Sequence, residues 1–216
     1  MSHADFSLYL VLDPDLCDDP EGMVRTARQA VLGGATIVQL RAPTWKKRRW
    51  LDTARALKAM LAPLCVPLIV NDHLDVALMA DADGVHLGQA DLPAAEARRW
   101  LGPGKIVGLS VTNVAQLSAA ADGVDYLGIG PVFSTRTKKD AAPVIGVETF
   151  SALAAVSPLP VVAIGGIDAD NCAQLIKAGA QGIAVVSAIC GQSDPAGAAA
   201  RLRARIDTAK RDDPLR

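Results

Sequence analysis

Short apolar runs recur along the chain, and their residues do not alternate between apolar and polar. Each run is rich in Val, Ile and Leu, which favour strands. Strands that stay apolar throughout are typical of a parallel sheet covered on both faces. Eight segments have this character: 8–13, 36–41, 67–72, 84–88, 106–111, 126–133, 160–167 and 182–189.

Between these runs lie Ala-rich segments whose apolar residues recur with the period of a helix. We predict helices over 23–34, 46–61, 93–102, 113–123, 148–157, 170–180 and 194–210. Eight strand–helix units in a chain of 216 residues predict an α/β protein, a single (β/α)₈ TIM barrel. A doubly wound open sheet is the alternative. No linker or shift in composition divides the chain, so we expect one domain over 1–216.

Composition and charge exclude several classes of protein. Hydrophobic residues make up 50% of the chain and the net charge is −1. A full core can be buried, and no nucleic-acid partner held through bulk charge is expected. No apolar run is long enough to span a bilayer, so we expect no membrane partner. The start of the chain lacks the features of a signal peptide, and the four cysteines form no CxxC pair. We therefore expect a cytoplasmic protein with reduced thiols.

Small, polar or charged residues gather where the predicted strands end. In a barrel the active site lies at the carboxyl ends of the strands, so these residues should meet at one face. In chain order they are Gln39 and Arg41; Asn71 and Asp72; His86, Gln89 and Asp91; Ser110; the run 135–140; Gly165 and Gly166; and Val186 and Ser187. A purely structural barrel has no need of this pattern.

Two kinds of ligand site follow from these residue types. Asp72 and Asp91 end neighbouring strands and predict a Mg²⁺ site, because Mg²⁺ usually takes one or two carboxylates and oxygens of a bound phosphate. Arg41 and Lys138 add positive charge suited to a phosphate. The backbone at Gly166 and Ser187 predicts a second anion site, next to a helix that would begin near Asp168.

Several of these residues, and a basic run at 46–49, also have a purely structural interpretation. Asp72 and Asp91 each precede a predicted helix and could serve as caps. The run 46–49, Lys-Lys-Arg-Arg, is typical of a solvated helix face. His86 lies in an apolar strand, where a packed histidine is commoner than a catalytic base. Taken together, these interpretations would require many coincidences on one face.

Seven segments resemble the thiamine phosphate synthase family, in the family's order and over nearly the whole chain. The combination of HLGQ-x-D with GPVF-x-T-x-TKKDA is specific. The segments are VQLR (38–41), LIVNDHLDVAL (68–78), ADGVHLGQADLP (82–93), GLSV (108–111), YLGIGPVFSTRTKKDA (126–141), AIGGI (163–167) and VVSAI (185–189).

The resemblance implies an Mg²⁺-dependent transferase with small-molecule substrates. It would join hydroxymethylpyrimidine diphosphate to a (carboxy)thiazole phosphate and release pyrophosphate. Position by position, Gln39, Arg41 and Asn71 would hold the pyrimidine diphosphate, and Asp72 and Asp91 would bind Mg²⁺. Ser110 and Lys138 would contact the diphosphate, and Arg41, Ser110 and Lys138 would be catalytic. The remaining contacts, to the thiazole phosphate, would come from Thr135, Thr137, Gly166, Val186 and Ser187.

One departure from the family pattern lies just after Arg41. The family usually has an acidic residue and then a lysine there, whereas this chain has Ala42 and Pro43. Lys46 or Lys47 could supply the missing cation from the next helix. Two alternatives stay open: a thiazole tautomerase on the same barrel, which would need no Mg²⁺, and a paralogue that binds thiamine phosphate without making it. The sequence does not fix the oligomeric state.

Overall fold

The computed structural model describes residues 4–119, 123–137 and 142–212. Eight parallel strands form a closed barrel in which each strand pairs with its neighbours in chain order, and β8 pairs with β1. The strands are β1 (Leu8–Leu12), β2 (Ile37–Leu40), β3 (Leu68–Asn71), β4 (Gly84–Leu87), β5 (Ile106–Val111), β6 (Tyr126–Ile129), β7 (Val161–Ile164) and β8 (Gly182–Val185). The predicted (β/α)₈ barrel is confirmed, and the open sheet is excluded.

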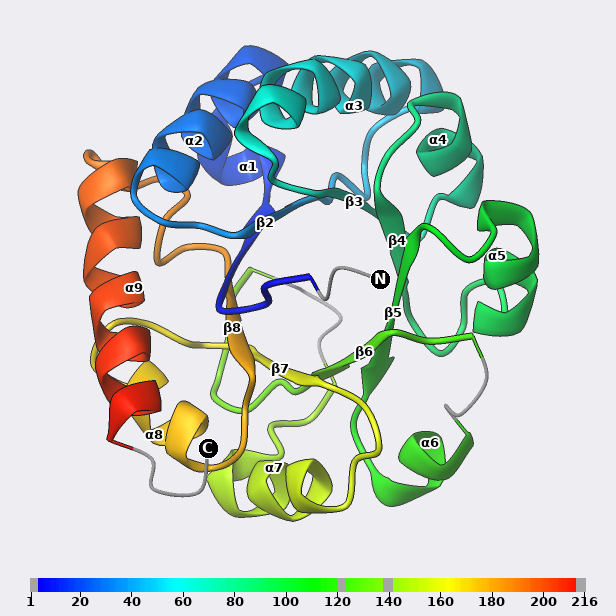
Figure 1. The fold of residues 1–216 in the computed structure, drawn as a ribbon. Coiled ribbons are helices and arrows are strands. Elements are labelled where there is room, and N and C mark those ends of the chain that lie inside the picture. Colours follow the sequence, from blue (N-terminus) through cyan, green and yellow to red (C-terminus); the bar gives the residue numbers. More distant parts are fainter. Residues whose placement is uncertain (1–3, 120–122, 138–141, 213–216) are drawn as a thin grey trace.

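Helices surround the strands as an outer ring (Figure 1). They are α1 (Pro14–Cys17), α2 (Pro20–Leu32), α3 (Lys47–Leu61), a 3₁₀ turn (Ala62–Leu64), α4 (Leu74–Met79), α5 (Ala94–Leu101), α6 (Val114–Ala119), α7 (Gly146–Ala155), α8 (Cys172–Lys177) and α9 (Pro195–Arg211). Among the described residues, no helix combines the length and apolarity needed to cross a bilayer.

Side chains of each strand alternate between two apolar layers. On β1, Leu8, Leu10 and Leu12 point outward and pack under the helices, whereas Tyr9 and Val11 point into the barrel. The residues between the strands and the helices are mostly aliphatic and almost wholly buried. Both faces of every strand are therefore covered, which explains why the sequence shows no polar alternation.

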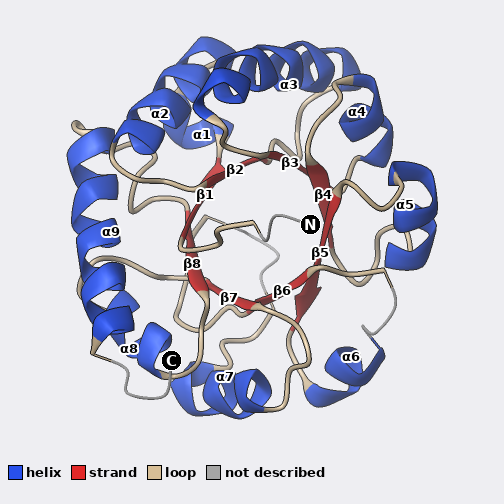
Figure 2. Cartoon of the chain, in the orientation of Figure 1, coloured by secondary structure: helices blue, strands red, loops and turns tan. Residues whose placement is uncertain are grey.

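The interior of the barrel is closed at its amino end. Phe6, which precedes β1, packs against Tyr126 with ring centroids 4.7 Å apart. In the view along the barrel axis, the first described residues cross the opening inside the ring of strands (Figure 2). The carboxyl ends of the strands and the loops that follow them are left to form the opposite mouth.

Three strands end three or four residues earlier than the apolar pattern predicts, and four others end one residue earlier. The predictions 126–133, 160–167 and 182–189 were too long, since β6 ends at Ile129, β7 at Ile164 and β8 at Val185. Gly165 and Gly166 follow β7 with φ of 100° and 65°, outside the strand region. After β8, the backbone turns so that the N–H groups of Ile189 and Cys190 donate to the carbonyl of Val186. Apolarity continues past the strands because these turns are also partly buried.

Candidate active site

A cavity of about 200 Å³ opens at the carboxyl ends of the strands. Nine residues predicted from the sequence as ligand-binding line it: Gln39, Arg41, Asn71, Ser110, Thr135, Thr137, Gly166, Val186 and Ser187. Residues from β2, β3 and β5 therefore face residues that follow β6, β7 and β8 across one space, as the closed strand order requires. Asp72 and Asp91 are not part of this lining. Lys138, the tenth predicted ligand-binding residue, lies outside the described residues.

Arg41 follows β2 and lines the cavity, and its guanidinium forms an ion pair with a buried carboxylate. Its Nη1 lies 3.4 Å from Oδ2 of Asp13, which directly follows β1. The other carboxylate oxygen of Asp13 accepts the N–H of Asp15 at 3.0 Å and so caps α1. Burial raises the pKa of Asp13, although the Asp15 N–H and the charge of Arg41 both act in the opposite direction. Asp13 was not predicted from the sequence as a functional residue, and its position at a strand end was the available signal.

A buried network of hydrogen bonds forms the floor of the cavity. Gln39 Nε2 donates to the hydroxyl of Tyr9 at 2.8 Å, and the two tyrosine hydroxyls of Tyr9 and Tyr126 are 2.8 Å apart. Nδ1 of His86 lies 2.8 Å from the Tyr126 hydroxyl, and its Nε2 lies 2.9 Å from Oγ of Ser110. We call these five residues, Gln39, Tyr9, Tyr126, His86 and Ser110, the floor network. It joins two predicted ligand-binding residues through three that the pattern of strand ends did not assign to ligand binding.

The two predicted metal ligands lie on the adjacent loops after β3 and β4. Asp72 has a φ of 61°, and its backbone N–H donates to the carbonyl of His86 at 2.8 Å. One carboxylate oxygen of Asp91 accepts the N–H of Gly88 at 2.7 Å. The end of β3 pairs with β4, with Asn71 beside His86, so the loops that carry the two aspartates are neighbours.

Neither aspartate is the cap residue of the helix that follows it. The cap positions of α4 and α5 are His73 and Pro93. No cluster of three or more His, Cys, Asp or Glu residues suited to a metal occurs in the described part of the chain. The donor set that remains, two carboxylates on neighbouring loops, fits Mg²⁺, which usually keeps several waters and takes few protein ligands.

The loop after β7 forms a narrow backbone turn on the other side of the mouth. A Cβ on Gly166 would lie 2.4 Å from the carbonyl oxygen of Ser134, so this position accepts only glycine without rearrangement. The Nδ2 of Asn171 donates to the Gly166 carbonyl at 3.0 Å and steadies the turn. The helix predicted to begin near Asp168 begins at Cys172 instead. The Asp168 carboxylate accepts the N–H groups of Asp170 and Asn171, which forms a separate turn before the helix.

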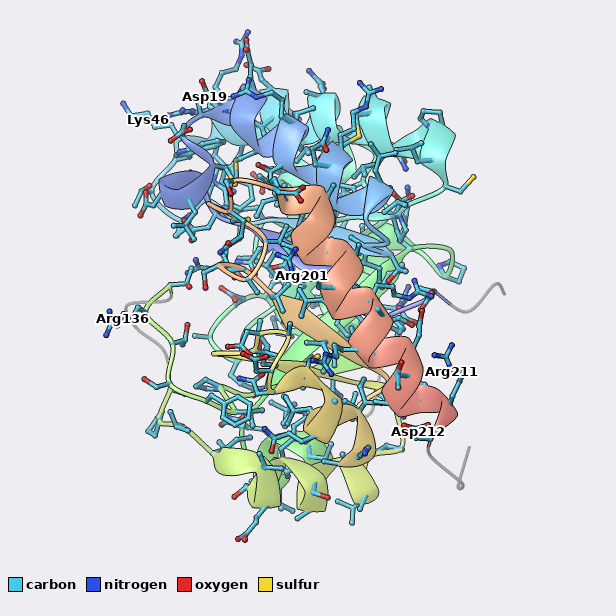
Figure 3. All side chains as sticks on the ribbon, turned by 90° about the vertical axis from the view of Figure 1, so that its left-hand side faces the viewer. Asp19, Lys46, Arg136, Arg201, Arg211 and Asp212 are labelled. Atoms are coloured by element: carbon cyan, nitrogen blue, oxygen red, sulfur yellow. The ribbon has the colours of Figure 1, made fainter. Side chains whose placement is uncertain are left out.

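The basic run 46–49 lies on the outside of the mouth. All four side chains are exposed, which confirms the predicted solvated helix face. Figure 3 shows Lys46 and Arg136 on one side of the molecule and Arg211 and Asp212 on the other. Lys47 Nζ lies 2.8 Å from both Nδ1 of His73 and Oδ1 of Asp75. It is therefore bound beside the loop that carries Asp72, with its charge paired to that of Asp75, whereas Lys46 and Arg48 line an open groove between α2 and α3.

Comparison with known proteins places this barrel in a family. A family model described as thiamine monophosphate synthase matches residues 8–189. The chain is 53% identical over 200 residues to a thiamine-phosphate synthase of Laribacter hongkongensis, covering 93% of this chain and 95% of that protein. It is also 53% identical over 207 residues to the enzyme of the same name from Xanthobacter autotrophicus, covering 95% and 98%.

A solved structure agrees with these sequence matches. Thiamine phosphate pyrophosphorylase from Pyrococcus furiosus superposes with a TM-score of 0.85 at 36% identity, over 96% of this chain and 98% of that one. The similarity thus extends over the whole barrel and includes every strand end that lines the cavity. The chain belongs to the thiamine monophosphate synthase family.

Proposed function

We propose that this protein is a transferase that joins hydroxymethylpyrimidine diphosphate to a thiazole phosphate, giving thiamine phosphate and pyrophosphate. The proposal rests on two sets of residues that face each other across the cavity. Gln39, Arg41 and Ser110 line one side of the cavity, and Gly166 and Ser187 line the other. A reaction between two phosphorylated substrates needs two anion sites that face each other across a short gap.

Binding of the diphosphate rests on the first side of the cavity. Arg41 has a planar guanidinium that matches phosphate oxygens, and Asp13 restricts its orientation. Ser110 and Asn71 add neutral polar groups beside it. Lys47 lies beside the loop after β3, where its charge is paired with that of Asp75. This lysine could take the place of the cation missing at Pro43 only by leaving Asp75, and Pro43 itself has neither a charge nor an N–H to offer.

Asp72 and Asp91 would hold Mg²⁺, as their donor set fits that ion. Bound there, Mg²⁺ would neutralise charge on the diphosphate and make pyrophosphate a better leaving group. The thiazole phosphate would be held by backbone N–H groups at Gly166, Val186 and Ser187 and by the hydroxyls of Thr135 and Thr137. Lys138, outside the described residues, is proposed to contact the diphosphate from the loop after β6.

The chemistry needs neither a strong base nor a covalent nucleophile. The bond between the pyrimidine methylene carbon and the diphosphate oxygen breaks, and the electron pair leaves with pyrophosphate. The methylene cation is stabilised by the ring, and the thiazole nitrogen forms the new C–N bond with its own lone pair. The residues act by orienting the two substrates and by placing positive charge and hydrogen-bond donors at the leaving group.

Turnover with both substrates tests the proposal. The protein is mixed with Mg²⁺, the pyrimidine diphosphate and the thiazole phosphate, and thiamine phosphate and pyrophosphate are measured together. We expect the two products in equal amounts and their loss in Asp91→Ala. A tautomerase would act on the thiazole alone, without Mg²⁺ and with little effect of this substitution. A binding paralogue would show a ligand-dependent rise in Tm and no products; either result overturns the proposal.

A further inference from the structure

In each hydrogen bond of the floor network one group donates and the other accepts, and this order determines which hydrogen atoms point toward the substrates. We propose that Tyr9 and Tyr126 hold His86 in the tautomer that carries its proton on Nε2, so that the hydroxyl of Ser110 donates to the ligand. His86, Tyr126 and Tyr9 are positioning residues in this view. The inference deepens the proposed function, on which the identity of the ligand rests.

The direction begins at Tyr9. Its side chain is 1% exposed, and its hydroxyl oxygen accepts the Nε2–H of Gln39 at 2.8 Å. The hydroxyl hydrogen of Tyr9 therefore has to find its own acceptor, because a buried donor without a partner is costly. Among the described residues, the acceptor within reach is the hydroxyl oxygen of Tyr126, at 2.8 Å. Tyr9 is thus the donor and Tyr126 the acceptor in this pair.

The hydrogen of Tyr126 is then directed to His86. Tyr126 is also 1% exposed, and Nδ1 of His86 lies 2.8 Å from its hydroxyl. Burial raises the pKa of both tyrosines well above the ordinary value, so both hydroxyls stay protonated. If Nδ1 accepts this hydrogen, it carries none of its own. The proton of the neutral ring is then on Nε2, which donates to Oγ of Ser110 at 2.9 Å.

The other two states of the ring leave a hydrogen without an acceptor. With a proton on Nδ1, either in the other neutral tautomer or in the imidazolium, the ring would donate to Tyr126. Tyr126 would then turn its hydrogen toward Tyr9. The Tyr9 oxygen would accept twice, from Gln39 and from Tyr126, and its own buried hydrogen would have no acceptor among the described residues. With Gln39 Nε2 facing Tyr9, the Nε2–H tautomer is the state of the ring that gives both tyrosine hydroxyl hydrogens an acceptor.

Because of this order, one end of the floor network offers the cavity a hydrogen-bond donor and the other end offers it an acceptor. Ser110 accepts from His86, so its own O–H is directed elsewhere, and Ser110 lines the cavity. At the other end, Gln39 uses its Nε2 on Tyr9, which leaves Oε1 as the acceptor that the cavity can use. The cavity therefore offers a donor to an anionic oxygen at Ser110 and an acceptor to an N–H or O–H group at Gln39. A heterocycle that carries a diphosphate has groups of both kinds.

Nuclear magnetic resonance reads the tautomer directly. The chain has three histidines, so the ¹⁵N signals of His86 can be assigned with His3→Gln and His73→Gln variants of the full-length, ¹⁵N-labelled protein. We expect Nε2 of His86 to show the shift of a protonated nitrogen and Nδ1 that of an unprotonated one, without any ligand. A proton on Nδ1, or on both nitrogens, in the folded protein at pH 7.5 overturns the inference.

A pair of tyrosine variants tests the cause. Tyr126→Phe removes the donor to Nδ1, so the Nδ1–H form should become populated. Tyr9→Phe removes a buried hydroxyl of the same kind but leaves Tyr126 able to donate, so the Nε2–H form should persist. Equal tautomer changes in both variants would contradict the proposed order. Should either variant fail to fold, the signals of the unsubstituted protein still decide the question.

Activity separates this inference from the proposed function. If both hold, Tyr126→Phe should lower kcat/KM for thiamine phosphate formation by about tenfold, the value of one typical hydrogen bond. A protein with Nε2–H at His86 but no turnover would keep the network and overturn the proposed function. Turnover with Nδ1–H at His86 would keep the function and overturn the network's direction.

Discussion

Asp13 and Arg41 form a partly buried ion pair that links the ends of two neighbouring strands, with Oδ2 and Nη1 3.4 Å apart. The side chains of Arg41 and Asp13 are 16% and 7% exposed, so solvent screens the pair only weakly. The same carboxylate caps α1 through the N–H of Asp15. One residue thus orients a cation at the mouth and starts the first helix.

Asp13→Asn should reduce catalysis more than stability. The amide keeps an oxygen for the Asp15 N–H but no longer holds the guanidinium of Arg41 by charge. We expect kcat/KM to fall by about 10- to 100-fold, as for loss of a charged hydrogen bond. The free energy of unfolding should change by about 1 kcal/mol or less, because the lost attraction is offset by the relief of a buried charge. A fall in activity that matches a large loss of Tm would contradict this division.

The same substitution should change how stability depends on pH. Burial raises the pKa of Asp13 in the folded protein above its value in the unfolded chain. The folded state then binds more protons, so this residue's contribution to stability is largest at low pH and is lost as the pH rises above about 4. Denaturant unfolding at several pH values should show this loss in the parent protein and a flatter profile in Asp13→Asn.

Gly166→Ala should disturb the backbone turn after β7. Gly166 has a φ of 65°, and an added Cβ would lie 2.4 Å from the Ser134 oxygen. We expect a loss of about 2–4 kcal/mol, from the left-handed backbone and from the close contact. Gly104→Ala is the control, because a Cβ there meets nothing within 4 Å and its φ is not positive. Urea unfolding should place the control within about 0.5 kcal/mol of the parent.

Removal of the metal, and of one of its proposed ligands, should have matching effects. Chelation with EDTA should abolish thiamine phosphate formation, and added Mg²⁺ should restore it. Asp91→Asn retains an oxygen for the Gly88 N–H but loses the charge, so half-maximal activity should require at least about tenfold more Mg²⁺. Asp168→Asn is the control, since Asp168 accepts only local backbone N–H groups in the described structure. An equal Mg²⁺ requirement in both variants would exclude Asp91 as a ligand.

The four thiols should differ sharply in reactivity. Cys65 is exposed, whereas Cys17, Cys172 and Cys190 are buried. Because thiol reagents need access to a thiolate, we expect one thiol per chain to react rapidly in the folded protein and three more after denaturation. Cys65→Ser should remove the rapid phase and leave the other three unchanged. A second rapid thiol in the native protein would show that α1, α8 or the turn after β8 opens readily.

The fold and the position of the site follow from local patterns in the sequence. Eight apolar runs separated by helical segments predict a parallel sheet covered on both faces, and their number favours a barrel, whose closure the strand order then shows. Residues at the strand ends must then meet at one mouth, and nine of those predicted to bind ligands line a single cavity. The helix start near Asp168 was misplaced because Asp168 satisfies backbone donors in a turn of its own instead of capping the helix.

Only the tertiary structure decided which buried polar groups meet. Tyr9 and Tyr126 are 117 positions apart, and Asp13 and Arg41 are 28 apart, yet each pair makes direct contact. Tyr9 and Tyr126 occupy inward positions that an aliphatic residue could equally fill, so periodicity carries no sign that their hydroxyls bond. Those partners are fixed when the sheet closes with β8 beside β1, since the closure sets which inward side chains share a level of the barrel.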